Sequence, residues 1–221
     1  MMGSLRTSVA PPSAYSTVKN LTAGGTTGNE RLTVVTGVVL IALLAVIGVT
    51  IISLRQLLWV HLFVGVLLIG PVALKLGSTG YRFVRYYTGK PAYRRVGPPA
   101  TLLRLIAPMV VLSTAVVFAS GVALLFAGPQ SRDTLLPIHK VSFFVWLGFT
   151  AIHILGHLPA IPAALRADYG RPAGWSNDVT GRAGRTLSLA SALTAGLVVA
   201  ILVIPQFAPW LHAYNIFHHH H

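Results

Sequence analysis

Residues 138–157 read IHKVSFFVWLGFTAIHILGH and place three histidines, His139, His153 and His157, in one apolar run. A run of this length can cross the ~30 Å hydrocarbon core of a bilayer as a helix. An imidazole in such a helix is costly without a partner, and ionisable residues inside membrane spans are usually functional. The run therefore predicts a membrane helix with a polar site inside it.

The composition of the chain points to the same class of protein. Of 221 residues, 54% are hydrophobic and 10% are charged, and the mean hydropathy is +0.70. Soluble domains carry about 25% charged residues. The sequence predicts an all-α integral membrane protein whose first four spans form an up-down four-helix bundle. The five predicted transmembrane helices cover roughly 32–53, 57–78, 102–127, 136–163 and 186–205.

The rest of the chain is organised around this membrane domain, which is assigned to residues 31–206. Residues 1–30 are polar and are expected to form a flexible cytoplasmic tail. Residues 207–217 carry Trp and Tyr and are expected to lie at the outer interface. Residues 218–221 are interpreted as the remnant of a purification tag and carry no functional argument.

Positive charge is distributed unequally between the two sides of the membrane. With helix ends counted, 14 of the 17 Lys and Arg lie on the side of the tail and of the 79–101 and 164–185 loops; the exceptions are Arg55, Arg132 and Lys140. By the positive-inside rule, the N-terminus is cytoplasmic and the C-terminus outside, in a multi-pass protein of the cell membrane. Because the basic residues flank spans, the net charge of +13 indicates contact with the lipid bilayer and not with nucleic acid.

The residue inventory narrows the chemistry of any site. There is no cysteine, which excludes disulfides, thiolate-bound iron–sulfur clusters and covalent haem attachment. The four acidic residues all lie outside the predicted spans, which argues against a carboxylate metal site. Zinc takes three or four protein ligands. A planar haem needs two, so histidine-ligated haem b suits this inventory best.

Two histidines on different spans are expected at the same depth. His61 lies about five residues from the outer end of the 57–78 span, and His139 a few residues from the outer end of the 136–163 span. His153 follows His139 by 14 residues, about 21 Å along the same helical face. We predict that His61 and His139 ligate one haem iron from opposite sides.

These positions resemble the membrane cytochrome b subunits of formate dehydrogenases and nickel–iron hydrogenases. In that family, histidines near the outer ends of helices 2 and 4 bind an outer haem. A second helix-4 histidine, 14 residues deeper, shares an inner haem with a histidine of helix 1. The resemblance covers roughly residues 31–165, and His61, His139 and His153 match three of the four positions. The fourth is missing, because span 32–53 has no histidine.

The deeper residues leave alternatives open. His153 either ligates a second haem iron or acts with His157, as a hydrogen-bonding partner of a quinone or as a proton carrier. Lys75, 14 residues after His61, is either an inner-haem ligand or a cation that reaches for the interface. One haem is favoured over two because span 32–53 supplies no partner.

The expected function is that of a membrane-bound b-type cytochrome, which transfers electrons between a quinone or cytoplasmic donor and an outer acceptor. A redox protein or a quinone is the expected partner, and a homo-oligomer is an open alternative. One rival is an outer-face haem oxidoreductase resembling ferric reductases, in which case the protein is itself an enzyme. Another is a haem-free membrane anchor subunit or small-solute carrier. The basic aromatic segment 77–99 is interpreted as interfacial, or as a docking surface or a place that holds haem propionates.

The charge asymmetry makes a prediction about topology. Single cysteines introduced at Thr88 and Ser131 of this cysteine-free chain should differ in their reaction with an impermeant thiol reagent added to intact cells. The Ser131→Cys variant should be labelled, and the Thr88→Cys variant should be spared until the membrane is opened. The reverse pattern would show that the chain is inserted the other way round.

Overall fold

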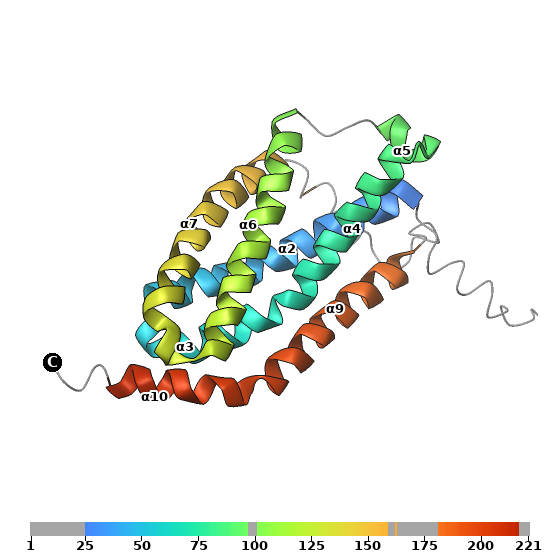
Figure 1. Ribbon diagram of the computed structural model, residues 1–221. Helices are drawn as coiled ribbons and strands as arrows, with labels where there is room; N and C mark the ends of the chain where they lie inside the picture. Colours follow the sequence, from blue (N-terminus) through green and yellow to red (C-terminus); the bar gives the residue numbers. More distant parts are fainter. Residues whose placement is uncertain (1–24, 97–100, 159–161, 163–180, 217–221) are drawn as a thin grey trace, which may run out of the picture.

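The computed structural model describes residues 25–96, 101–158, 162 and 181–216, and every element in these ranges is helical (Figure 1). Five helices are long and apolar enough to cross a membrane, which confirms the all-α membrane class. Most of the predicted tail, most of the 164–185 loop and residues 218–221 lie outside the described residues. The elements are α2 (Gly25–Ile52), α3 (Leu54–Leu67), α4 (Ile69–Tyr87), α5 (Pro91–Val96), α6 (Thr101–Ala127), η1 (Pro129–Ser131), α7 (Arg132–His157), α9 (Arg182–Leu202), η3 (Ile204–Phe207) and α10 (Ala208–Ile216).

The second span is longer than its apolar stretch predicts. α3 and α4 form one rod because Leu68, between them, keeps right-handed helical backbone angles (φ −57°, ψ −23°). The rod covers Leu54–Tyr87, 34 residues and about 50 Å, against a hydrocarbon core of about 30 Å. Hydropathy falls after residue 78, but the helix continues to Tyr87, and Gly89, with a positive φ of 79°, lies in the turn that follows it.

Two antiparallel hairpins make up the first four spans, in the predicted up-down order (Figure 1). α2 pairs with the α3–α4 rod through a turn at Ser53, and Leu57 departs from helical angles as the chain reverses. α6 pairs with α7 through a turn at Gly128, which has a φ of 76°. Within the second hairpin, Trp146 Nε1 donates a hydrogen bond to Thr114 Oγ1 at 3.0 Å.

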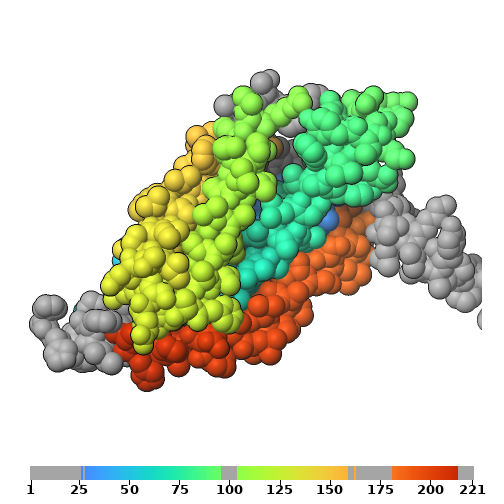
Figure 2. Space-filling model, in the orientation of Figure 1, coloured from blue at the N-terminus to red at the C-terminus, as the bar shows by residue number. Residues whose placement is uncertain are grey.

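The fifth span, α9, is an integral part of the bundle and not an appendage to it. It packs along α3 and α4, and the space-filling view shows α9 in contact with α4 (Figure 2). A Cβ atom at Gly70 would collide with the carbonyl of Ala192, and one at Gly196 with the carbonyl of Leu67. Two glycines therefore let these backbones touch, which is how membrane helices without a hydrophobic driving force gain packing energy.

The segment after α9 folds back over one end of the bundle. Phe207 is 1% exposed, and its ring meets Trp59 of α3 edge-on at 6.3 Å. Trp210 Nε1 donates to the carbonyl of Leu125 at 3.4 Å. The predicted interfacial segment is thus a short helix, α10, that covers this end with aromatic side chains.

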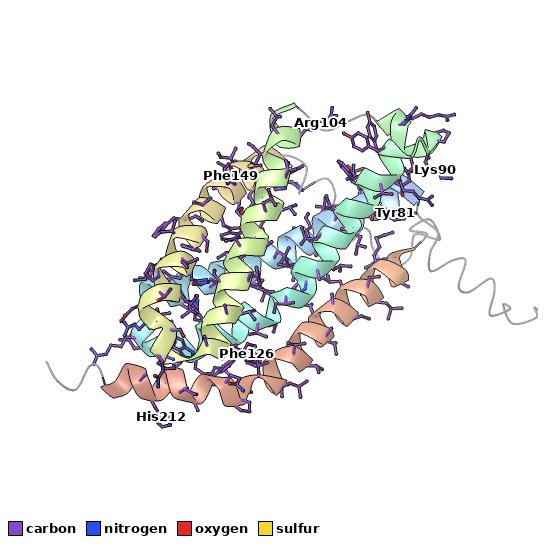
Figure 3. All side chains as sticks on the ribbon, viewed as in Figure 1. Tyr81, Lys90, Arg104, Phe126, Phe149 and His212 are labelled. Atoms are coloured by element: carbon purple, nitrogen blue, oxygen red, sulfur yellow. The ribbon has the colours of Figure 1, made fainter. Side chains whose placement is uncertain are left out.

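The bundle has two chemically different ends (Figure 3). Phe126 and His212 lie at the end that α10 covers, which we call the His61 end. Arg104 lies at the opposite end, which we call the Lys75 end. The His61 end is the one predicted to face outside, and the Lys75 end the one predicted to face the cytoplasm.

The close approach of α4 and α9 makes a prediction about stability. Gly70→Ala should lower the free energy of unfolding by about 1–3 kcal/mol, because the added methyl meets backbone that cannot yield. Gly77→Ala on the same helix is the matched control: its methyl meets no atom within 4 Å, and alanine favours helix. Thermal unfolding in detergent should separate the two variants, and equal midpoints would contradict this packing.

Candidate functional site

His61 is held by a hydroxyl of the neighbouring helix in its own hairpin. Its Nδ1 lies 2.9 Å from Oγ1 of Thr50, on α2. Thr50 is 1% exposed, and its single hydroxyl proton is donated to the carbonyl of Ile47 at 2.6 Å. The hydroxyl oxygen is therefore left as an acceptor, and Nδ1 of His61 is the group that donates. This arrangement places the ring proton on Nδ1 and the free lone pair on Nε2.

His139 has an equivalent partner in the second hairpin. Its Nδ1 lies 3.0 Å from Oγ of Ser120 on α6, and that hydroxyl donates to the carbonyl of Val117 at 3.0 Å. The same argument assigns the proton to Nδ1 and the lone pair to Nε2. Room for the ring comes from Gly121, where a Cβ atom would lie 3.0 Å from Cε1 of His139.

The two histidines come from different hairpins and are near enough to interact electrostatically. In the described part of the chain, no hydrogen bond to Nε2 of His61 is found, and the His139 ring has one further hydrogen bond, to the backbone of Val117. An imidazole whose Nδ1–H is bound by a second residue and whose Nε2 is free is the usual form of a metal-ligating histidine. Each member of the predicted pair is thus held through Nδ1 by a hydroxyl of its own hairpin.

The donor set restricts what this site can hold. Within residues 25–96, 101–158, 162 and 181–216, no three His, Asp or Glu side chains are grouped to hold a metal ion. A bare zinc or iron site would need more protein ligands than this pair. Two imidazoles from opposite sides satisfy an iron whose four other ligands are supplied by a macrocycle. The residues present therefore fit haem and do not fit a mononuclear metal site.

The three deeper candidates form a separate cluster towards the Lys75 end. Nζ of Lys75 donates to the carbonyl of Thr33 on α2 at 2.6 Å. His153 and His157 lie edge to face, with ring centroids 4.7 Å apart, and both interact electrostatically with Lys75. The lysine is therefore bonded to the neighbouring helix α2. The roles of these three residues stay predictions.

The basic aromatic segment pairs its arginines with tyrosines. Nε of Arg85 donates to the hydroxyl of Tyr81 at 2.9 Å, and its guanidinium lies 5.1 Å from the centre of that ring. Arg104 of α6 donates to the hydroxyl of Tyr87 at 2.8 Å. Burial, and then the neighbouring Tyr81, raise the pKa of Tyr93. Arg85 is 24 residues, about 36 Å of helix, from His61, too far for contact with a group bound there.

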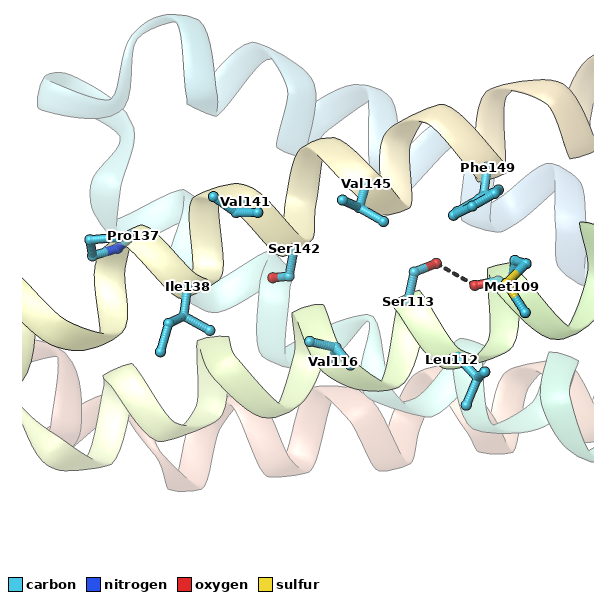
Figure 4. Close-up of a pocket in the computed structure, with 10 residues that line it drawn as sticks. All are labelled: Met109, Leu112, Ser113, Val116, Pro137, Ile138, Val141, Ser142, Val145 and Phe149. Atoms are coloured by element: carbon cyan, nitrogen blue, oxygen red, sulfur yellow. Dashed lines mark hydrogen bonds between the residues drawn. The ribbon is translucent and has the colours of Figure 1, made fainter.

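A groove of about 610 Å³ between α6 and α7 offers little chemistry (Figure 4). Its polar lining residues are Ser113 and Ser142, and their hydroxyls donate to the carbonyls of Met109 and His139 at 2.7 and 2.9 Å. The other lining residues are apolar, and they are Met109, Leu112, Val116, Pro137, Ile138, Val141, Val145 and Phe149. A surface of this kind suits lipid tails.

Comparison with known proteins returned no match: no family model, no curated protein and no solved structure is significantly similar to the chain. The candidate site is therefore defined by contacts within this chain alone. That geometry includes three residues that sequence reasoning missed, Thr50, Ser120 and Gly121. The only sequence signal for them is that each is a small or hydroxyl residue in an apolar span, a property shared with many others.

Proposed function

We propose that this protein is a membrane-bound b-type cytochrome with one haem b between His61 of α3 and His139 of α7. The observation that carries the proposal is the matched pair of Nδ1–hydroxyl contacts, at 2.9 and 3.0 Å, on two different hairpins. A structural histidine needs one such partner to be tolerated in a bundle. Two on different hairpins, each oriented through Nδ1, favour ligation of a shared group through Nε2.

The chain's own residues would perform three tasks. His61 and His139 bind through Nε2, and Thr50 and Ser120 keep both rings in the required orientation. Phe207 of η3 and Trp210 of α10, which pack at the His61 end, would limit the access of water to a group bound there. Haem would supply a one-electron couple, while the axial ligands, their hydrogen bonds and burial would set its potential.

The direction of electron transfer follows from the predicted topology. A quinone or a cytoplasmic redox protein would deliver electrons, and an acceptor at the His61 end would take them. The second predicted role, an oxidoreductase that reduces a substrate at this end, requires substrate access past α10. The cover formed by Phe207 and Trp210 disfavours it.

The ligand assignment is tested by the optical spectrum of the purified protein. The unmutated protein should be red, and dithionite should sharpen the bands of low-spin haem b. His61→Ala and His139→Ala should each abolish the low-spin spectrum, because one axial ligand cannot maintain six-coordinate iron. His212→Ala, at an exposed histidine of α10, is the matched control and should leave the spectrum unchanged. A colourless protein after haem supplementation would refute the proposal.

The number of haems is tested by a pyridine haemochrome assay against protein concentration. We expect a ratio near one in the unmutated protein and in His153→Ala. Lys75 donates to the carbonyl of Thr33, and span 32–53 contains no histidine that could be a second ligand beside His153. A ratio near two that falls to one in His153→Ala would show an inner haem.

The orienting hydroxyls have a distinct signature. Ser120→Ala and Thr50→Val should retain haem but raise its midpoint potential by about 20–60 mV, the equivalent of about 0.5–1.5 kcal/mol for one hydrogen bond. The potential rises because an imidazole without its Nδ1–H partner donates less to ferric iron. Thr36→Val is the control, since this buried hydroxyl bonds only its own helix, at the Leu32 carbonyl. Redox titration that gives equal shifts in all three variants would contradict the assignment.

A further inference from the structure

The end of α4 and the short helix α5 form a surface that the proposed haem site does not use (Figure 1). The two helices are joined by the turn at Gly89, and the ring of Tyr93 meets the ring of Tyr81 edge-on at 6.1 Å. Tyr81 and Lys90 mark this region in Figure 3. We call residues 81–95 the α4–α5 surface.

The α4–α5 surface carries more positive charge than the acidic residues of the whole chain could neutralise. Its cations, followed by the one that adjoins it from α6, are Arg82, Arg85, Lys90, Arg94, Arg95 and Arg104. The chain has 4 acidic residues, so at least two of these cations would lack a carboxylate even if every Asp and Glu paired with one of them. Net positive charge therefore remains here, wherever the acidic residues lie.

Two of the arginines are positioned by tyrosines. Nε of Arg85 donates to the hydroxyl of Tyr81 at 2.9 Å, and its guanidinium lies 5.1 Å from the centre of that ring. Arg104 donates to the hydroxyl of Tyr87 at 2.8 Å. A tyrosine hydroxyl is neutral, so each pair keeps the full positive charge of its arginine. Each bond uses one of the several N–H donors of a guanidinium, which can still donate to an anion.

Large apolar side chains are exposed beside these cations. The exposed fractions of Phe83, Val84 and Tyr87 are 62%, 56% and 51%. Val84 follows Leu54, the first residue of the α3–α4 rod, by 30 residues, or about 45 Å of helix. A bilayer with its headgroups is about 40–45 Å thick. A rod that enters the bilayer at Leu54 therefore reaches the opposite headgroup layer near Val84, and tilting places this end deeper.

We propose that the α4–α5 surface binds the headgroups of anionic phospholipids in the leaflet at the Lys75 end. Its arginines contact lipid phosphates, while Phe83 and Val84 enter the boundary of the acyl chains. Basic residues next to a membrane helix, with apolar side chains among them, are typical of binding to anionic lipid.

A soluble acidic protein would match the charge of this surface equally well. The lipid is favoured because exposed apolar side chains lie among the cations at the depth where headgroups meet acyl chains. The proposal does not depend on haem, because Arg85 is about 36 Å of helix from His61.

The test measures which lipid lies next to the surface in a bilayer. The full-length Val84→Cys variant, in a chain that has no other cysteine, is labelled with a nitrobenzoxadiazole fluorophore and reconstituted in vesicles. Nitroxide-labelled phosphatidylglycerol and nitroxide-labelled phosphatidylcholine are compared as quenchers at equal content. Phosphatidylglycerol should be preferred about fivefold, the contribution of one cation near an anionic surface.

The charge dependence of this preference assigns it to the α4–α5 surface. Combining Arg94→Gln with Arg95→Gln, at two exposed positions, should abolish the preference. Combining Arg55→Gln with Lys140→Gln is the matched control, since it removes two exposed cations at the His61 end and should retain the preference. High salt should weaken the preference in the otherwise unmutated labelled protein, which keeps the test decisive if a variant fails to fold.

Three results would overturn the proposal. Equal quenching by the two lipids would show that the surface does not select anionic headgroups. A preference that survives both high salt and the loss of Arg94 and Arg95 would show that it arises from other residues. Quenching by aqueous iodide but by neither lipid would show that the surface projects into water, where a soluble acidic partner could bind it.

Discussion

The proposed site depends on one constraint, that an imidazole inside an apolar bundle is costly unless it has a hydrogen-bond partner. His61 and His139 have such partners within their own hairpins, the hydroxyls of Thr50 and Ser120. Each hairpin thereby carries an imidazole that is oriented through Nδ1. A group that binds both Nε2 atoms would lie between the hairpins, and this is the physical basis of the proposed haem site.

The remaining packing positions the two hairpins. α9 lies against α3 and α4 through Gly70 and Gly196, so it supports the first hairpin along its length. α10 crosses the His61 end, where Phe207 and Trp210 contact residues of both hairpins. The second hairpin packs chiefly on itself, with Trp146 bonded to Thr114. A bundle built in this way can separate its hairpins by the thickness of a macrocycle while both remain internally stable.

Much of the fold could be predicted from the sequence, because the hydropathy of each apolar run indicates whether it is long enough to cross a membrane as a helix. The expected depth of His61 and His139 follows from their distance to the predicted span ends. The all-α membrane class and the five helices long enough to cross a membrane are confirmed. The length of α4 was underestimated, since Tyr and Arg lower hydropathy without ending a helix. Thr50 and Gly70 could not be singled out, because their roles depend on helix rotation and crossing angle, which composition does not encode. The haem, the topology and the roles of the deeper residues stay predictions.

The central claim is that two imidazoles coordinate one iron, and electron paramagnetic resonance of the oxidised, purified protein tests it most directly. The account predicts a low-spin ferric signal of the bis-imidazole type, with an intensity of about one spin per chain. The signal should be lost in both His61→Ala and His139→Ala and retained in His153→Ala. A high-spin signal in the unmutated protein, or a low-spin signal that survives His139→Ala, would contradict the assignment of these two residues as the ligands.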